Sequence, residues 1–201
     1  HHLFSDSVKK FYEQEMVPRV DKWNEQGIVD RDFWLKAGEA GIMGGSVAEE
    51  YGGSGGDLGF DSVALYEQAR AGDGSWGYGI QSIVIHYVIA YGSHEQKAKW
   101  LPKLVSGEKI GALAMTEPGA GSDVQSISTS AERVGNQYQI NGSKIFITNG
   151  QSADLVIVTS KTDKSQGAKG VSLIMVETKN ADGFRRGKNL KKLGLKGNDT
   201  S

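Results

Sequence analysis

The hydrophobic period of the chain changes from helical to strand-like near Lys109 to Gly111, and this change constrains the fold more than any other feature. Before it, apolar residues recur three and four positions apart. After it, short β-branched runs alternate with turn residues. The 201 residues are therefore predicted to form an α+β, multi-domain chain, with an all-α helical domain over residues 1–110 and a β-rich domain over residues 111–201.

Several helices are predicted in the first part. The first amphipathic run extends from Ser5 to Met16 and is interrupted by Pro18, and Asp30 can cap a second helix that leaves through Gly41. A third helix is expected from about Asp61 to Arg70. A capping box, Ser93 with Gln96, begins the last helix, and Pro102 falls near its end.

The clearest helix precedes Gly92. Its apolar residues recur at helical spacing and are Ile80, Ile83, Val84, Tyr87, Val88 and Tyr91. Ile85 and Ile89 widen the apolar surface beyond one stripe, so this helix is predicted to be central to its domain. His86 is interpreted as a core histidine with satisfied hydrogen bonds rather than a catalytic one.

Turn residues predict the strand pairing of the second part. Gly135-Asn136 and Asn141-Gly142 each separate two strand-like runs, and the second pair predicts a type I′ hairpin leading into a strand from Lys144 to Thr148. Two further apolar runs, 155–159 and 171–176, flank a polar loop. Because no helix long enough for a parallel crossover lies between the strands, we expect a mostly antiparallel sheet that closes toward a barrel or sandwich.

Composition excludes several functional classes. A formal net charge of -1 gives no field for nucleic acid or an anionic membrane. The absence of cysteine excludes disulfides, thiolate catalysis and zinc thiolate sites, and no metal site is expected. No apolar segment approaches the roughly 20 residues that a membrane-spanning helix needs. The chain opens in mid-pattern without methionine, as expected if an upstream segment, such as a targeting one, has been removed.

The stretch Leu113 to Asp123 has the composition of a loop that contacts a ligand. Pro118 forbids continuation of a paired strand, and Gly119 and Gly121 keep side chains away from whatever approaches the backbone. Thr116 and Ser122 place hydroxyl groups on either side of the bend. Turn chemistry alone is equally compatible with a simple hairpin corner.

Four segments resemble the acyl-CoA dehydrogenase family. Ala114 to Asp123 is similar to the first signature of that family at all ten positions, and 141–150 (Asn-Gly-Ser-Lys-Ile-Phe-Ile-Thr-Asn-Gly) is similar to its second flavin-contacting segment. Residues 92–97 with Trp100-Leu101-Pro102 resemble the segment that leads into the middle domain, and 193–200 resembles a late middle-domain segment. The resemblance covers essentially the whole chain, and the sequence near Phe184 to Gly187 is most similar to that of long-chain members.

The resemblance implies a helical N-terminal domain, a β-rich middle domain and a C-terminal helical bundle, with FAD and acyl-CoA between them. Only the first two are expected here, and the middle domain is expected to be truncated. The family's catalytic base is a carboxylate of the missing bundle, so no catalytic residue is assigned. Glu117 matches a loop residue of the cofactor motif, not the base.

Cofactor and substrate residues are carried over by the same resemblance. The residues implied to contact FAD are Leu113, Met115, Thr116, Gly121, Ser122, Phe146, Ile147 and Thr148. Among them, Phe146 would cover the flavin ring and Gly121 and Ser122 would lie at the phosphate end. The residues implied to contact the CoA portion are Ser122, Ala168 and Lys169. Taken singly, Phe146 is more typical of a core residue in a strand, and Lys169 is more typical of a solvated surface charge.

The implied reaction is FAD-dependent α,β-dehydrogenation of a medium- to long-chain fatty acyl-CoA in β-oxidation, with electrons passed to an electron-transfer flavoprotein. The implied parent protein is a homotetramer of the bacterial cytoplasm or, alternatively, of the mitochondrial matrix. Two other hypotheses remain: an acyl-CoA oxidase or flavin monooxygenase of the same superfamily, and a non-catalytic fragment with a partial cofactor surface. The 201-residue chain alone is expected to be inactive.

Overall fold

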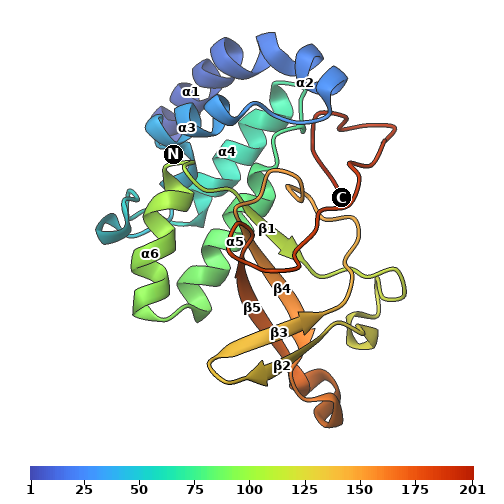
Figure 1. The fold of residues 1–201 in the computed structure, drawn as a ribbon. Helices are drawn as coiled ribbons and strands as arrows, with labels where there is room; N and C mark the ends of the chain where they lie inside the picture. Colours follow the sequence, from blue (N-terminus) through green and yellow to red (C-terminus); the bar gives the residue numbers. More distant parts are fainter.

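The computed structural model describes residues 1–201, with the helices gathered on one side and the sheet on the other (Figure 1). The helices are α1 (His2–Phe11), α2 (Val20–Gln26), α3 (Arg31–Glu39), α4 (Leu58–Arg70), α5 (Tyr78–Tyr91) and α6 (His94–Val105). The helical domain expected from the apolar spacing is therefore confirmed. None of these helices combines the length and apolarity that a membrane crossing requires.

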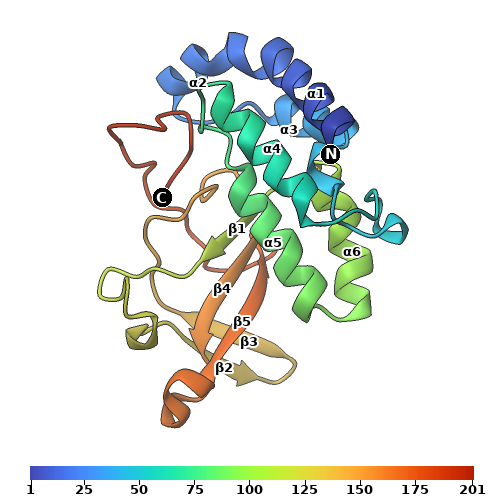
Figure 2. The ribbon, with the colours of Figure 1, turned by 180° about the vertical axis from the view of Figure 1, so that it is seen from behind.

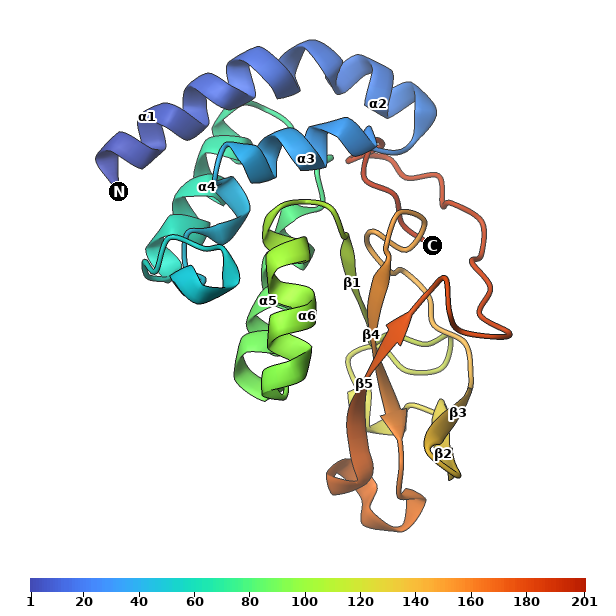
Figure 3. The same ribbon diagram turned by 60° about the vertical axis from the view of Figure 1, so that its left-hand side comes forward.

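Pro18 changes the helix type but does not end the first helical run. A π-helical turn, Tyr12–Met16, and a 3₁₀ turn, Val17–Arg19, join α1 to α2. Pro18 lies in the first turn of the 3₁₀ segment, where a missing N–H is tolerated. The result is a long, bent helical arch that passes over α3 (Figure 3).

The predicted caps have different outcomes. Ser93 and Gln96 form the capping box of α6: Gln96 N–H donates to Ser93 Oγ (3.2 Å), and Ser93 N–H donates to Gln96 Oε1 (2.8 Å). Asp30 occupies the cap position of α3 but makes no capping bond, because its carboxylate accepts instead from Trp23 Nε1 (3.1 Å) and Lys22 Nζ (2.7 Å). Pro102 lies inside α6, which continues to Val105.

Two apolar clusters hold the helical part together. The first is aromatic and joins the arch to α3 and to the segment before α5; its largest members are Tyr12, Trp23, Phe33, Trp34, Trp76 and Tyr78. The second packs α5 and α6 against the sheet, through residues such as Val84, Leu101 and Leu155. The central position predicted for α5 is thus confirmed, because it contacts both α6 and the sheet.

The sheet is organised around β4 (Leu155–Lys161). On one edge, β1 (Gly111–Ala114) runs parallel to it, and beyond the end of β1 the strand β2 (Ser130–Val134) contacts it at Ser130↔Lys161. On the other edge, β5 (Val171–Glu177) pairs antiparallel along the whole of β4. β2 also pairs antiparallel with β3 (Gln137–Asn141).

The predicted barrel or sandwich is therefore not found, since the sheet is mixed: β4 pairs antiparallel with β5 but parallel with β1 and β2. The prediction assumed that a parallel pair needs a helical crossover. Here the connection from β1 to β4 is long enough without a helix, because it contains the β2–β3 hairpin and an irregular segment.

One of the two predicted hairpin turns forms. Val134 pairs with Gln137 across Gly135-Asn136, with a positive φ at Gly135. At Asn141-Gly142 neither residue has the positive φ that a type I′ turn requires, and the segment 144–148 is not a strand. Gly142 lies close to Thr129, since a Cβ on Gly142 would be 2.2 Å from Thr129 Oγ1, so β3 ends against the backbone that precedes β2.

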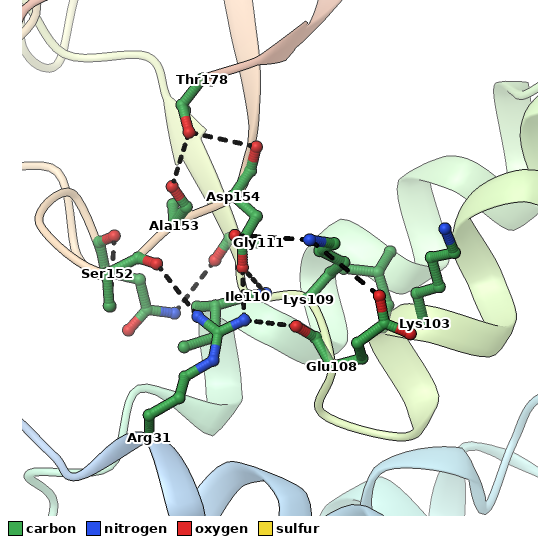
Figure 4. Close-up of polar contacts among 12 residues, drawn as sticks. Arg31, Lys103, Glu108, Lys109, Ile110, Gly111, Ser152, Ala153, Asp154 and Thr178 are labelled. Carbon is green, nitrogen blue, oxygen red and sulfur yellow. Dashed lines mark hydrogen bonds and ion pairs between the residues drawn. The ribbon is translucent and has the colours of Figure 1, made fainter. Parts of the chain in front are cut away.

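Arg31 joins the helical part to the sheet part (Figure 4). From the start of α3, its Nη2 donates to Glu108 O and to Asp154 Oδ2 (2.6 Å). Asp154 Oδ2 also accepts from Ile110 N–H (3.1 Å), so one carboxylate holds the guanidinium and the connecting segment together. The division into residues 1–110 and 111–201 stays a prediction.

Candidate functional site

The loop that follows β1 is held by a buried carboxylate. Glu117 is 4% exposed, and its side chain reaches the segment before β2. Glu117 Oε2 accepts from Ser128 N–H (2.6 Å) and Ser128 Oγ (2.7 Å), and Oε1 accepts from Thr129 N–H (3.0 Å). Within the loop, Glu117 and Ala120 exchange backbone hydrogen bonds of 2.9 and 3.1 Å, which closes the turn around Pro118 and Gly119. The hydrogen bonds of the buried Glu117 therefore fix the conformation of the loop.

Lys144 provides the countercharge to Glu117. Its side chain is 10% exposed, and its Nζ donates to Glu117 Oε1 (2.9 Å), Met115 O (3.0 Å) and Thr159 Oγ1 (3.0 Å). Burial acts to raise the pKa of Glu117. The hydrogen bonds from Lys144, Thr129 and Ser128 outweigh this effect and hold the pKa well below its usual range. Glu117 is therefore an ionised structural group, and such a group is a poor base.

The segment 145–148 lies beside the end of β1. Ile145 N–H donates to Thr116 O (2.9 Å), and Lys144 binds the neighbouring carbonyl of Met115. The predicted contact residues Met115 and Thr116 are thus placed beside the segment that contains Phe146, Ile147 and Thr148, whereas Leu113 packs against the apolar cluster of α5 and α6.

Phe146 has an unusual conformation. Its φ is 61°, and its side chain is 64% exposed. A bulky residue in the left-handed region is strained, and such strain concentrates at binding sites. The alternative that Phe146 is a core residue of a strand is therefore wrong. Ile147, in contrast, is buried.

The last residues of the chain support this segment from the other side. Ile147 N–H donates to Ser201 O (2.7 Å), Ser201 N–H donates to Ile147 O (3.0 Å), and Thr148 pairs with Thr200. Asp199 is buried, and its carboxylate accepts from the N–H groups of Gln151 (2.6 Å) and Ser152 (3.1 Å). Burial raises the pKa of Asp199 although these hydrogen bonds oppose the shift.

A large cavity lies along α4 and α5, which run side by side (Figure 2). Its volume is about 1100 Å³, and apolar side chains such as Leu65, Ile83 and Tyr91 line it. Thr148 and Asn198 line the end of the cavity near the sheet. Thr148 therefore belongs both to the cavity wall and to the segment beside the β1 loop.

The polar residues of the cavity wall centre on Asp61 of α4. Its carboxylate accepts from Tyr78 Oη (2.6 Å), Ser82 Oγ (2.8 Å) and Ser46 Oγ. His86 Nε2 lies 3.5 Å from Asp61 Oδ2, and the His86 side chain is partly exposed to the cavity rather than enclosed in the core. Burial acts to raise the pKa of Asp61, but the three hydroxyl donors and His86 lower it overall. Asp61 is consequently a fixed negative charge.

The remaining predicted residues are all exposed. Gly121 and Ser122 are exposed and follow the Glu117–Ala120 turn. Ala168 and Lys169 are exposed in a 3₁₀ segment, Lys164–Gly170, at the tip that joins β4 to β5. Their assignment to the CoA portion stays a prediction.

Sequence reasoning missed the cavity residues of α4 and α5. The sequence did contain a pattern that indicates the cavity: the apolar surface of α5 extends around the helix, and α6 and the sheet cannot cover all of it. Ile83 and Tyr91 remain exposed on that uncovered side. Asp61 gave no such signal, since its hydroxyl partners, Ser46 before α4 and Tyr78 and Ser82 on α5, are all distant from it in the sequence.

The residues at the β1 loop fit a flat aromatic cofactor with an anionic tail. Phe146 offers an exposed ring that is held in a strained conformation. A Cβ placed on Gly119 or Gly121 would meet no atom within 4 Å, so the backbone there is open to a ligand. The fold and the site define a class of proteins in which a helical domain packs on a sheet domain and a cofactor loop lies where they meet.

Comparisons with known proteins identify the family. Residues 1–108 match the sequence model of the acyl-CoA dehydrogenase N-terminal domain, and residues 112–201 match that of the acyl-CoA dehydrogenase middle domain. The mitochondrial long-chain specific acyl-CoA dehydrogenase of Rattus norvegicus is 44% identical over 204 residues, which cover 100% of this chain and 47% of the relative.

Solved structures agree. An acyl-CoA dehydrogenase from Geobacillus kaustophilus superposes with a TM-score of 0.95 at 45% identity, covering 100% of this chain and 53% of that one. A glutaryl-CoA dehydrogenase from Mycobacterium smegmatis in complex with FADH2 gives a TM-score of 0.89 at 29% identity, covering 99% and 50%. The chain belongs to the acyl-CoA dehydrogenase family. It spans about half the length of the curated relatives that it matches.

Proposed function

We propose that the protein to which this chain belongs is an FAD-dependent acyl-CoA dehydrogenase that acts on medium- to long-chain fatty acyl-CoA in β-oxidation. The observation that carries this proposal is the position of Thr148, which joins the apolar cavity of α4 and α5 to the loop segment that contains Phe146. A hydrocarbon chain in the cavity would therefore end beside the place where we put the flavin ring. The identity to the long-chain rat enzyme supports the substrate class.

The chain's own residues would bind and orient the two ligands. Leu113, Met115 and Thr116 would contact the flavin ring from the end of β1, and Phe146, Ile147 and Thr148 would contact it from the facing segment. Gly121 and Ser122 would lie at the phosphates, where an open backbone offers N–H donors. The M. smegmatis relative in complex with FADH2 supports FAD as the cofactor.

Bound FAD would supply the acceptor for the hydride that leaves the β carbon. The apolar cavity wall would exclude water from the reacting carbons. Glu117 and Asp61 are unsuited to take the α proton, because hydrogen bonds stabilise both as carboxylates. We therefore place the base in the C-terminal domain that the family adds to these two.

Ser122, Ala168 and Lys169 are proposed contacts of the CoA portion, and an electron-transfer flavoprotein is the proposed electron acceptor. The proposed assembly is a homotetramer. The bacterial and mitochondrial relatives leave two candidate compartments, the bacterial cytoplasm and the mitochondrial matrix.

The proposal is tested on the full-length protein that carries this sequence, by dye-coupled oxidation of acyl-CoA substrates of increasing chain length. We expect turnover to depend on FAD and to be highest for medium to long chains. Rapid reoxidation of the substrate-reduced protein by air in a stopped-flow experiment would instead favour the oxidase hypothesis. The isolated 201-residue chain should bind FAD weakly and show no turnover, as measured by flavin absorbance and the same dye assay.

Two substitutions test the site itself. Phe146→Ala should weaken flavin binding about tenfold, which corresponds to about 1.4 kcal/mol and lies within the range of aromatic stacking contacts. Gly121→Ala should weaken it too, because a methyl group would obstruct the phosphate approach. Gly187→Ala is the matched control, since its Cβ would also meet no atom within 4 Å but it lies outside the loop. Equal flavin affinities for all three variants would refute the placement of the cofactor.

A further inference from the structure

A second cavity lies where α6 meets the start of β4 and the end of β5. Its volume is about 320 Å³. Four lysines line it, Lys99, Lys103, Lys109 and Lys179, together with the carboxylates of Asp154 and Glu177. We call this cavity the lysine cleft. It shares no residue with the cavity along α4 and α5 or with the β1 loop.

The lysine cleft carries excess positive charge in a chain whose formal net charge is -1. Four ammonium groups face two carboxylates, which leaves a charge of +2 on the lining. Lys103 and Lys179 have no carboxylate oxygen within 4.0 Å, and Lys109 Nζ lies 3.8 Å from Asp154 Oδ1 and 4.0 Å from Glu108 Oε1. Like charges gathered in a concave site repel one another and attract a counterion.

The two carboxylates of the cleft are already engaged. Lys99 forms an ion pair with Glu177 Oε1 and lies over the Trp100 ring, 5.0 Å from its centroid. Asn180 Nδ2 donates to Glu177 Oε2 (2.5 Å), so both oxygens of Glu177 have donors. Asp154 Oδ2 is bound by Arg31 and by Ile110 N–H. The charges of Lys103, Lys109 and Lys179 are consequently not balanced by short ion pairs.

Backbone contacts hold two of these lysines side by side. Lys109 N–H donates to Lys103 O (2.9 Å), which folds the end of α6 back onto the connecting segment (Figure 4). Lys109 therefore stands between Lys103 and Asp154, the residue that binds Arg31 across the two parts of the chain. An anion in the cleft would bind next to this interdomain contact.

We propose that the lysine cleft binds a phosphate group with two negative charges. Lysine binds phosphate as a point charge, and a charge of -2 would balance the lining. The cleft is large enough for a free phosphate and for a small phosphate monoester. This site is independent of the proposed flavin and acyl-CoA function, so either proposal can fail without the other.

The experiment is calorimetric titration of the full-length protein that carries this sequence with inorganic phosphate at low ionic strength, with a second titration in added salt. We expect saturable binding with a dissociation constant of about 1 mM, weakened by salt because the contacts are partly exposed. Lys103→Ala with Lys179→Ala should raise the dissociation constant about fivefold or more, since each partly exposed charge contributes about two- to fivefold.

The control double variant is Lys10→Ala with Lys191→Ala, which changes the net charge equally at two exposed lysines without carboxylate partners. It should change phosphate binding less than about twofold. Thermal unfolding without phosphate checks that each variant is folded. The absence of saturable phosphate binding, or equal weakening by the two double variants, would overturn the proposal.

Titrations with AMP and adenosine distinguish the source of the phosphate group. Tighter binding of AMP than of phosphate, without binding of adenosine, identifies a nucleotide-like monoester. Equal affinities for AMP and phosphate show that the cleft recognises the phosphate group alone. Binding of adenosine that matches AMP and is insensitive to the loss of Lys103 and Lys179 contradicts a phosphate site.

Discussion

The buried pair Glu117–Lys144 should be a main determinant of the stability of the β1 loop. Glu117→Gln removes one charge and leaves Lys144 Nζ, which is almost fully enclosed, facing Met115 O and Thr159 Oγ1 without a counterion. Removing one partner of a buried ion pair typically costs about 3–5 kcal/mol, because the remaining charge stays desolvated. For a chain of this length, that loss corresponds to a decrease of about 6–20 °C in the unfolding midpoint.

The double variant Glu117→Gln with Lys144→Met distinguishes charge pairing from simple packing. Removing both charges leaves no uncompensated ion, so the double variant should be more stable than Glu117→Gln alone. Urea unfolding of the wild type, both single variants and the double variant gives the coupling free energy directly. Additive losses in this cycle would refute the reasoning, because they would mean that Lys144 does not depend on Glu117.

The exposed pair Lys99–Glu177 is the matched control. Its side chains are 56% and 27% exposed, so solvent screens their interaction. Glu177→Gln should cost less than about 1 kcal/mol. A loss as large as that of Glu117→Gln would show that burial is not the reason for the difference.

Two further predictions concern the helical part. Burial acts to raise the pKa of Asp30, but hydrogen bonds from Gln26, Lys22 and Trp23 lower it to about 2 from 3.8. The stability that Asp30 adds is therefore present above about pH 4 and is lost as the pH falls toward 2. Asp30→Asn should therefore be less stable than the wild type near neutral pH, and urea unfolding should show this difference shrinking across that interval; a difference independent of pH contradicts the assignment. Gly38→Ala should lower the free energy of unfolding by about 1–3 kcal/mol, as measured by thermal unfolding, because its Cβ would lie 2.1 Å from Ser106 O. The control Gly119→Ala, whose Cβ would meet no atom within 4 Å, should change that free energy by less than about 0.5 kcal/mol.

Local patterns predicted the helical part well and the sheet only in part. The apolar spacing around Val84 and Val88 and the capping box at Ser93 depend on residues within a few positions, so the sequence alone carries them. The parallel pairing of β1 with β4 joins residues about forty positions apart, and no local signal specifies it. The two-residue turn at Gly135, where a positive φ is required, could be predicted from the sequence.

The candidate site shows the same division. The small residues of the loop after β1 allowed a contact surface to be predicted from the sequence. The role of the buried carboxylate that fixes the loop could not be predicted. Glu117 has partners before β2 and after β3, and these segments approach only because the sheet forms. The cavity along α4 and α5 is also a tertiary feature, since each helix alone has an ordinary apolar pattern.

The conformation of Phe146 explains why the segment after β3 is irregular. The apolar run Ile145-Phe146-Ile147 favours a strand, which would turn Phe146 and its neighbours to opposite faces. Instead, Ile145 binds Thr116 on one side and Ile147 binds Ser201 on the other, so the backbone between them must bend. The positive φ at Phe146 takes up that bend and turns its ring outward, while Ile147 stays buried. The strain of this conformation is supported by hydrogen bonds on both sides, which is the condition under which a strained residue persists in a folded protein.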